Sequence, residues 1–141
     1  MQLYTVEEAR ALLPQVLPVL EQLRDSIARL RRLRTAVEAS ARGATADGHL
    51  LADPWADEAG DPGKPLRQVA REALKRLEAW GIEVKDAERG LIDFYHRREG
   101  ELVYLCYLPG EPTVDFWHPL DAGFAGRQPI GESSDSDPHQ Q

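Results

Sequence analysis

The stretch LIDFYHRREGELVYLCYL, residues 91–108, decides the fold of this 141-residue chain. Aromatic and β-branched residues dominate both of its halves, and the polar tripeptide at 98–100, which ends in glycine, separates them. This pattern is typical of two antiparallel strands joined by a three-residue turn with glycine in the left-handed conformation. The sequence therefore predicts strands over residues 91–97 and 102–108.

A three-residue turn would also set the register of this hairpin. Arg97 would face Glu101, and Asp93 would face Leu105 on one side of the sheet. Cys106 would then lie on the opposite side. Both sides are largely apolar in this register, so each needs a cover. We expect the helices to cover one side and the C-terminal loop or a second subunit to cover the other.

A long helix is predicted near the start of the chain. Thr5 and Glu8 form a capping box, in which each side chain bonds the backbone N–H of the other residue. The helix is expected over residues 6–42, with a kink near Pro14 and Pro18, because proline removes a backbone donor. Its apolar residues follow spacings of three and four, which indicates a seam for another helix: Leu13, Val16, Leu20, Leu23, Ile27, Leu30 and Val37.

A second helix is predicted over residues 65–80, with Pro65 in its first turn and Gly81 as its stop. The two helices would form an antiparallel hairpin. The first helix is much longer, so its overhanging seam is expected to pair with a copy of itself in a homodimer of coiled-coil type. Residues 43–64, rich in glycine, proline, alanine and aspartate, are expected to form a poorly ordered loop.

The C-terminal third completes the predicted domain. A third strand is expected over residues 113–117, then an ordered loop to residue 130, and a disordered polar tail over 131–141. The fold class is α+β, a single domain over 1–130 with a long kinked helical hairpin packed on a three-stranded antiparallel β-meander. Aromatic and glycine residues give the ordered loop its shape: Trp117, Gly123, Phe124 and Gly126.

Four polar residues are the candidates for a ligand-binding site: Asp93, Glu111, His118 and Arg127. Asp93 lies in mid-strand, where a carboxylate is costly unless it is paired. It is an acid, base or ligand carboxylate, or it forms a salt bridge to His118 or Arg127. His118 could be a general base, a metal ligand or a residue hydrogen-bonded within the loop.

The other two candidates also have two interpretations each. Arg127 could clamp a carboxylate or phosphate, or it could hold the loop closed by binding Asp93 or a backbone carbonyl. Glu111 is an exposed turn residue or joins His118 in binding a cation. No reaction follows from these residues, so whether the protein is an enzyme stays open, and no cofactor is implied.

The ligand-type side chains of Cys106, Glu111 and His118 lack the short paired spacing of a metal motif, so no metal site is predicted. Cys106 is interpreted as a buried, inert residue, with a nucleophile as the alternative. It is the only cysteine, which excludes an intrachain disulfide and favours a reducing cytoplasm.

The net charge of -7 argues against binding to nucleic acid or to an anionic membrane. No apolar run is long enough to span a bilayer, and the first ten residues lack a signal-peptide pattern. Four arginines on the long helix form either a nucleic-acid patch or, as we expect, a solvated face: Arg29, Arg31, Arg32 and Arg34.

Three segments resemble an uncharacterised prokaryotic family, domain of unknown function 2203: TVEEARALLPQV, GIEVKDAERGLIDF and YLCYLPGEPTVDFWHPLDAGFAGRQPI. The resemblance covers about residues 3–130 without the central loop, and its last segment is the most specific part. It implies a small soluble prokaryotic protein and brings no activity or catalytic residue. The matching polar, aromatic and glycine positions are Asp93, Cys106, Glu111, Trp117, His118, Gly123, Phe124, Gly126 and Arg127.

From the sequence we therefore expect a non-catalytic binding or self-association module of the cytoplasm. The alternative is a small-molecule or metal-binding site, catalytic or not, built from the four candidate residues.

Overall fold

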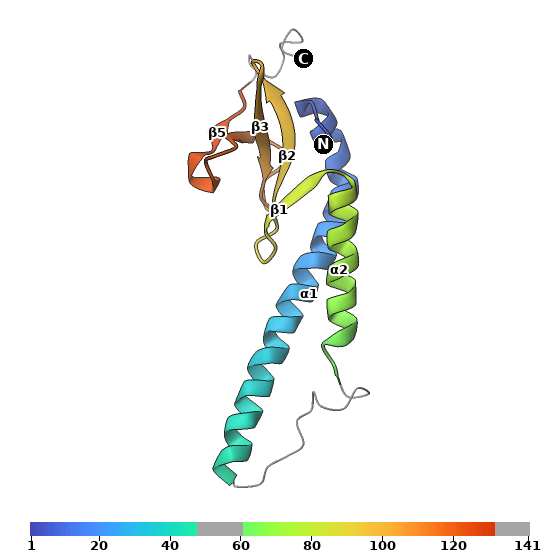
Figure 1. Cartoon of the computed structure of the whole chain (residues 1–141), viewed down its shortest axis with the longest axis vertical. Coiled ribbons are helices and arrows are strands. Elements are labelled where there is room, and N and C mark those ends of the chain that lie inside the picture. The colour runs from blue at the N-terminus through green and yellow to red at the C-terminus, as the bar shows by residue number, and fades with distance from the viewer. Residues whose placement is uncertain (48–60, 132–141) are drawn as a thin grey trace.

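The computed structural model describes residues 1–47 and 61–131, which form a helical layer and a sheet layer (Figure 1). Helices α1 (Val6–Asp47) and α2 (Lys64–Ala79) pack against each other. Five strands follow in one antiparallel sheet, in the spatial order of the chain: β1 (Ile82–Asp86), β2 (Leu91–Arg98), β3 (Glu101–Tyr107), β4 (Phe116–Pro119) and β5 (Gln128–Pro129). The fold is therefore α+β.

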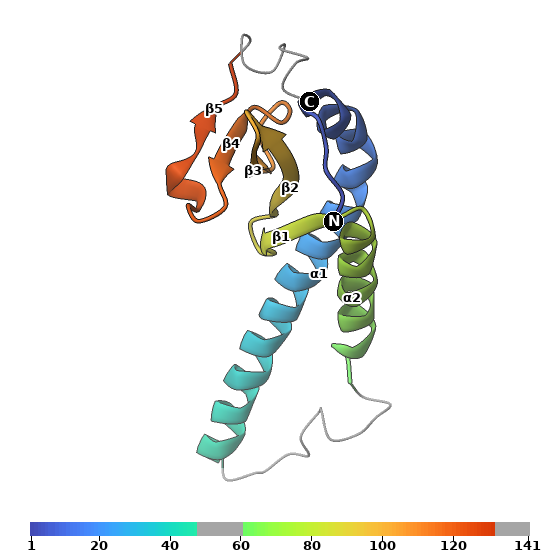
Figure 2. The same cartoon turned by 45° about the horizontal axis from the view of Figure 1, so that its top comes forward.

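Helix α1 begins at the predicted capping box. The Glu8 N–H donates to Thr5 Oγ1 at 3.0 Å, and the Thr5 N–H donates to Glu8 Oε1 at 2.9 Å. The helix continues through Pro14 and Pro18, and its axis changes direction within its N-terminal half (Figures 1 and 2).

The predicted end of α1 at residue 42 was wrong, because the helix runs on to Asp47. Gly43 ends a helix only when its backbone turns left-handed, and the alanines around it favour continued helix. Helix α2 and its left-handed Gly81 (φ 80°) match the prediction to within one residue. Residues 48–60 of the loop predicted over 43–64 lie outside the described residues, as do residues 132–141 of the tail predicted over 131–141.

The predicted register of the β2–β3 hairpin was wrong by one residue. The turn contains two residues, Glu99 (φ 52°) and Gly100 (φ 83°), and Arg98 pairs with Glu101. Two successive left-handed residues form the turn whose twist matches that of the flanking strands. As a result Asp93 pairs with Cys106, and these side chains share one face of the sheet.

The sheet has five strands, not the predicted three. Strand β1 pairs with β2 and follows α2 after only two turn residues, while β5 is only two residues long and contains a proline. Strand β1 has the alternation of a strand but was missed, whereas β5 is too short to mark a strand in sequence. The third predicted strand, 113–117, is β4 at Phe116–Pro119, so His118 belongs to a strand and not to the loop.

One face of the sheet packs against the helices and forms the core with them (Figure 2). The buried strand residues of this face are Ile82, Ile92, Phe94, Leu105 and Tyr107, and the buried helix residues include Val16, Leu20, Leu23 and Leu77. Within the part of the chain that the structure describes, no helix is long and apolar enough to cross a membrane.

The N-terminal segment adds to this face beside β2. The Tyr4 N–H donates to the Tyr95 carbonyl at 2.8 Å, and His96 Nδ1 lies 2.7 Å from the Tyr4 carbonyl. Burial lowers the pKa of His96 below its usual 6.5, partly offset by the Tyr4 carbonyl. His96 is therefore neutral in the fold, and its Nδ1–H donates to Tyr4.

We predict that stability falls with acidification because of His96. The folded state binds this proton less readily than the unfolded chain, so stability is full above pH 6.5 and declines as pH falls below it. Denaturant unfolding at about pH 7.5 and about pH 5.5 should show a larger loss for the wild type than for His96→Gln. Equal losses in the two proteins would contradict this assignment.

Candidate functional site

The candidate site lies on the face of the sheet that points away from the helices. The register places alternate residues of four strands on this face: Glu83, Lys85, Asp93, Tyr95, Tyr104, Cys106, Phe116 and His118. The C-terminal segment folds back against the same face, where the Arg127 guanidinium stacks on the Phe116 ring at 4.0 Å. The face is thus polar at its centre and covered at one side.

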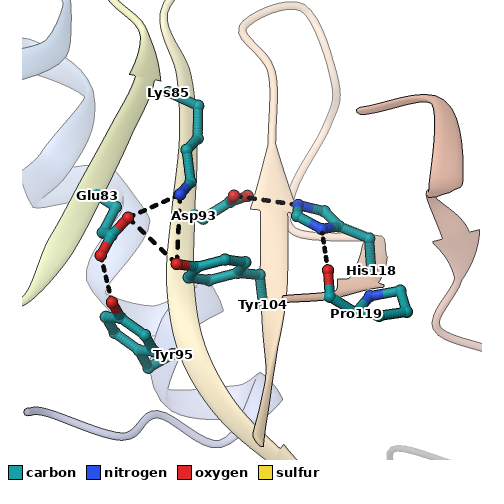
Figure 3. Close-up of polar contacts among 7 residues, drawn as sticks. All are labelled: Glu83, Lys85, Asp93, Tyr95, Tyr104, His118 and Pro119. Atoms are coloured by element: carbon teal, nitrogen blue, oxygen red, sulfur yellow. Dashed lines mark hydrogen bonds and ion pairs between the residues drawn. The ribbon is translucent and has the colours of Figure 1, made fainter. Parts of the chain in front are cut away.

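Asp93 and His118 form a buried pair at the centre of this face (Figure 3). His118 Nε2 lies 3.0 Å from Asp93 Oδ2. His118 is 3% exposed and Asp93 is 0% exposed. His118 Nδ1 lies 2.9 Å from the Pro119 carbonyl, which can only accept, so Nδ1 carries a hydrogen. The contact between Nε2 and Oδ2 therefore contains one further proton, held by either the imidazole or the carboxyl group.

The environment of Asp93 is unfavourable for a free carboxylate. Burial raises its pKa, and the neighbouring imidazole of His118 and a weak hydrogen bond from the Cys106 thiol offset part of this effect. Among the described residues, Asp93 Oδ1 has no hydrogen-bond partner. An unpaired acceptor in a buried position costs roughly 1–3 kcal/mol. The pair therefore satisfies only one of the two carboxyl oxygens.

Cys106 completes this group, although the sequence placed it on the opposite face. It is fully buried, and its Sγ lies within 4.8 Å of a ligand atom of Asp93 and of His118. Burial raises the pKa of its thiol, the Asp93 carboxylate raises it further, and Arg127 acts in the opposite direction. The thiolate is therefore disfavoured, which argues against a nucleophile.

Glu111 and Arg127 form a second pair beside the first. Arg127 Nη2 donates to both carboxylate oxygens of Glu111, at 2.8 and 2.7 Å, and the Leu108 N–H donates to Oε1 at 2.8 Å. The Arg127 side chain is 10% exposed, and the Glu111 side chain is 19% exposed. Arg127 thus holds the C-terminal segment through Glu111, and not through Asp93 or a carbonyl as the sequence suggested.

A third polar group lies at the solvent side of the face and was missed from the sequence (Figure 3). Glu83 accepts from Lys85 at 2.7 Å, from Tyr104 at 3.2 Å, and from the Tyr95 hydroxyl. The pKa of Glu83 is lowered by the hydrogen bonds from Lys85 and Tyr95. Apolar and polar residues alternate from Ile82 to Asp86, which is the period of a strand, so this pattern could have revealed Glu83 and Lys85.

The Tyr104 ring connects this outer group to the buried pair. Its centroid lies 5.3 Å from that of the His118 ring, and Lys85 Nζ lies 4.4 Å from the Tyr104 centroid. Tyr104 is 7% exposed, so its ring shields His118 while its hydroxyl reaches the charged residues outside.

The four loop residues predicted from the sequence have separate positions. Trp117 lies on the helix-facing side of β4 and stacks with Arg98 at 4.4 Å. Gly123 precedes the short helix η2 (Phe124–Gly126), and the Phe124 ring stacks with Arg127 at 4.6 Å. The segment is ordered, and its glycines have no part in the polar group.

The structure thus brings the four predicted site residues onto one face as two neighbouring pairs, with Cys106 adding to the first. A comparison with family models finds one that matches residues 2–130, described as an uncharacterized conserved protein (DUF2203). The chain belongs to this family. No curated protein and no solved structure matches the chain significantly. Membership in DUF2203 confirms the resemblance seen in the sequence and assigns no role to any residue.

We predict that the Glu111–Arg127 pair stabilises the closed C-terminal segment of this DUF2203 protein. Glu111→Gln leaves a largely buried guanidinium without its counter-charge, so the free energy of unfolding should fall by about 2–3 kcal/mol. The exposed pair of Asp25 and Arg29 is the control, and Asp25→Asn should change stability by about 0.5 kcal/mol or less. Denaturant unfolding measures both, and similar small effects would contradict the prediction.

Proposed function

We propose that this protein is a non-catalytic self-association module, in which the distal part of α1 pairs with α1 of a second copy. The observation that supports this is the difference in length between the helices. Helix α1 contains 42 residues and α2 contains 16. Figure 1 shows α1 extending well beyond the end of α2 and away from the sheet.

The apolar seam of α1 continues past the region that α2 covers. Leu23 is 2% exposed and lies in the core, whereas Leu33 and Val37 are both partly exposed. They line a hollow of about 300 Å³ together with Leu30 and three charged side chains: Arg34, Glu38 and Arg67. Gly63, directly before α2, lies close to Leu30, and from α2 only the Arg67 side chain lines the hollow beside Leu33 and Val37.

A second copy fits the exposed part of the apolar seam of α1 if the two α1 helices pair in antiparallel orientation. A two-fold axis near Thr35 would place Leu33 of one copy opposite Val37 of the other, and the reverse pair follows by symmetry. Only a few apolar layers are available on roughly 20 Å of helix beyond Leu33. We therefore expect a weak dimer that forms at high protein concentration, since small interfaces belong to transient complexes.

The placement of the candidate site residues supports this choice over a small-molecule site. Within each of the two pairs the side chains bind each other, and they have little exposed surface for a ligand.

The arginines on α1 are partly paired, since Arg29 forms an ion pair with Asp25 and Arg31 forms one with Glu88. This pairing and the acidic net charge disfavour nucleic acid as the partner. The single, buried Cys106 is compatible with a reducing cytoplasm.

Light scattering over a series of protein concentrations tests this proposal. The wild type should change from monomer towards dimer as concentration rises, and the double variant Leu33→Glu/Val37→Glu should remain monomeric. Two carboxylates at the centre of the seam would repel their copies. The control is Val69→Glu, which places a charge on an exposed apolar residue of α2 and should dimerise as the wild type does.

A wild type that stays monomeric at all concentrations would overturn the proposal. A dimer that persists in the double variant would also overturn it, because the apolar seam of α1 would then have no part in the dimer.

A further inference from the structure

We propose that Asp93, Cys106 and His118 form a binding site for one divalent cation of the zinc class. The three side chains come from strands β2, β3 and β4, which are neighbours in the sheet. Asp93 pairs with Cys106, and His118 pairs with Tyr104, which lies two residues before Cys106 on the same face, so that His118 is a diagonal neighbour of Cys106. The sheet itself therefore holds the three groups together, and no flexible loop is needed to assemble them.

The ligand atoms have the chemistry and the spacing that such a cation requires. One carboxylate oxygen, one thiol sulfur and one imidazole nitrogen all lie within 4.8 Å of one another. Zinc binds these three ligand types at about 2.0–2.3 Å, so its ligands lie roughly 3–4 Å apart. A mixed set with sulfur and nitrogen favours zinc over calcium or magnesium, which prefer oxygen ligands alone.

The orientation of His118 is that of a metal ligand. Its Nδ1–H donates to the Pro119 carbonyl at 2.9 Å, which directs Nε2 towards Asp93. A backbone carbonyl is one of the usual partners of the far nitrogen in a histidine that binds metal. The other buried histidine, His96, has the same kind of bond from Nδ1 to the Tyr4 carbonyl, yet it belongs to the opposite face.

The second, independent observation is Asp93 Oδ1. This oxygen is buried in a residue that is 0% exposed, and it has no hydrogen-bond partner among the described residues. Natural proteins rarely leave a buried acceptor unsatisfied, and an unseen ion is one of the recognised reasons. A cation bound between the three side chains would interact with this carboxylate directly.

The charges balance for a divalent ion. A carboxylate, a thiolate and a neutral imidazole contribute a total of two negative charges, which a divalent cation neutralises. The neighbouring Glu111 and Arg127 neutralise each other, so the whole buried region would carry no net charge. On binding, the ion replaces two protons, the one shared by Asp93 and His118 and the one on the Cys106 thiol.

Cobalt titration of chelator-stripped protein tests the site. Co²⁺ should bind one ion per chain and give the near-ultraviolet charge-transfer band of a cobalt–thiolate bond, and Zn²⁺ should displace it. Cys106→Ser keeps the size of the side chain and removes the thiolate. It should abolish this band and weaken Zn²⁺ binding by at least about tenfold. His118→Gln should weaken Zn²⁺ binding similarly.

The matched control is His96→Gln, which removes a buried histidine from the other face of the sheet and should bind both ions as the wild type does. Circular dichroism of the stripped proteins checks that each variant is folded, and Cys106→Ser decides the result if His118→Gln is not. The proposal is overturned if the wild type gives no saturable cobalt–thiolate band. It is equally overturned if Cys106→Ser binds Zn²⁺ as tightly as the wild type.

Discussion

The two-residue turn at Glu99 and Gly100 sets the register of β2 against β3, and the rest of the polar face depends on that register. Because side chains alternate along a strand, a shift of one residue would move every side chain of one strand to the other face. In the observed register Phe94 and Leu105 face the helices together, while Asp93 and Cys106 share the far side. The same turn thus builds the core and the polar group.

The far side of the sheet is closed by charged pairs and stacked rings rather than by a second helical layer. Arg127 makes this possible because its planar guanidinium stacks on the rings of Phe116 and Phe124 while its Nη2 binds Glu111. Arginine suits such a position, since its charge is spread over a flat group that is weakly hydrated. The cover is therefore polar and specific, which lets Asp93 be buried beneath it without an apolar layer.

Much of the fold follows from local patterns, and the errors have physical causes. The Thr5–Glu8 box and the apolar spacing of the helices are short-range signals, and both helices were located from them. The turn was misjudged because Arg98 can end a strand or begin a turn, and only the pairing of the whole hairpin decides between them. Strand β5 could not be found, because two residues gain their structure entirely from β4.

The candidate residues illustrate the same limit. Asp93 was identified because a carboxylate amid apolar strand residues is unusual at any register, and its pairing with His118 was one of the alternatives considered. The grouping of Cys106 with Asp93 and His118 could not be derived from the sequence, because it depends on the correct register of β2 against β3. Glu83 and Tyr104 were missed for a related reason, since the polar outer group exists only when β1 lies beside β2.

The arrangement of Asp93, Cys106 and His118 limits the chemistry that this face can perform. Burial keeps the Cys106 thiol protonated, and Tyr104 shields His118, so a nucleophile with access to substrate is not what the geometry provides. The same burial makes the carboxylate depend on a positive partner. The proton shared with His118 satisfies Asp93 Oδ2, and the Cys106 thiol is only a weak donor to the carboxylate, whereas a cation can interact with the carboxylate, the imidazole and the sulfur at once. The unsatisfied oxygen therefore distinguishes a site suited to a cation from a simple buried ion pair.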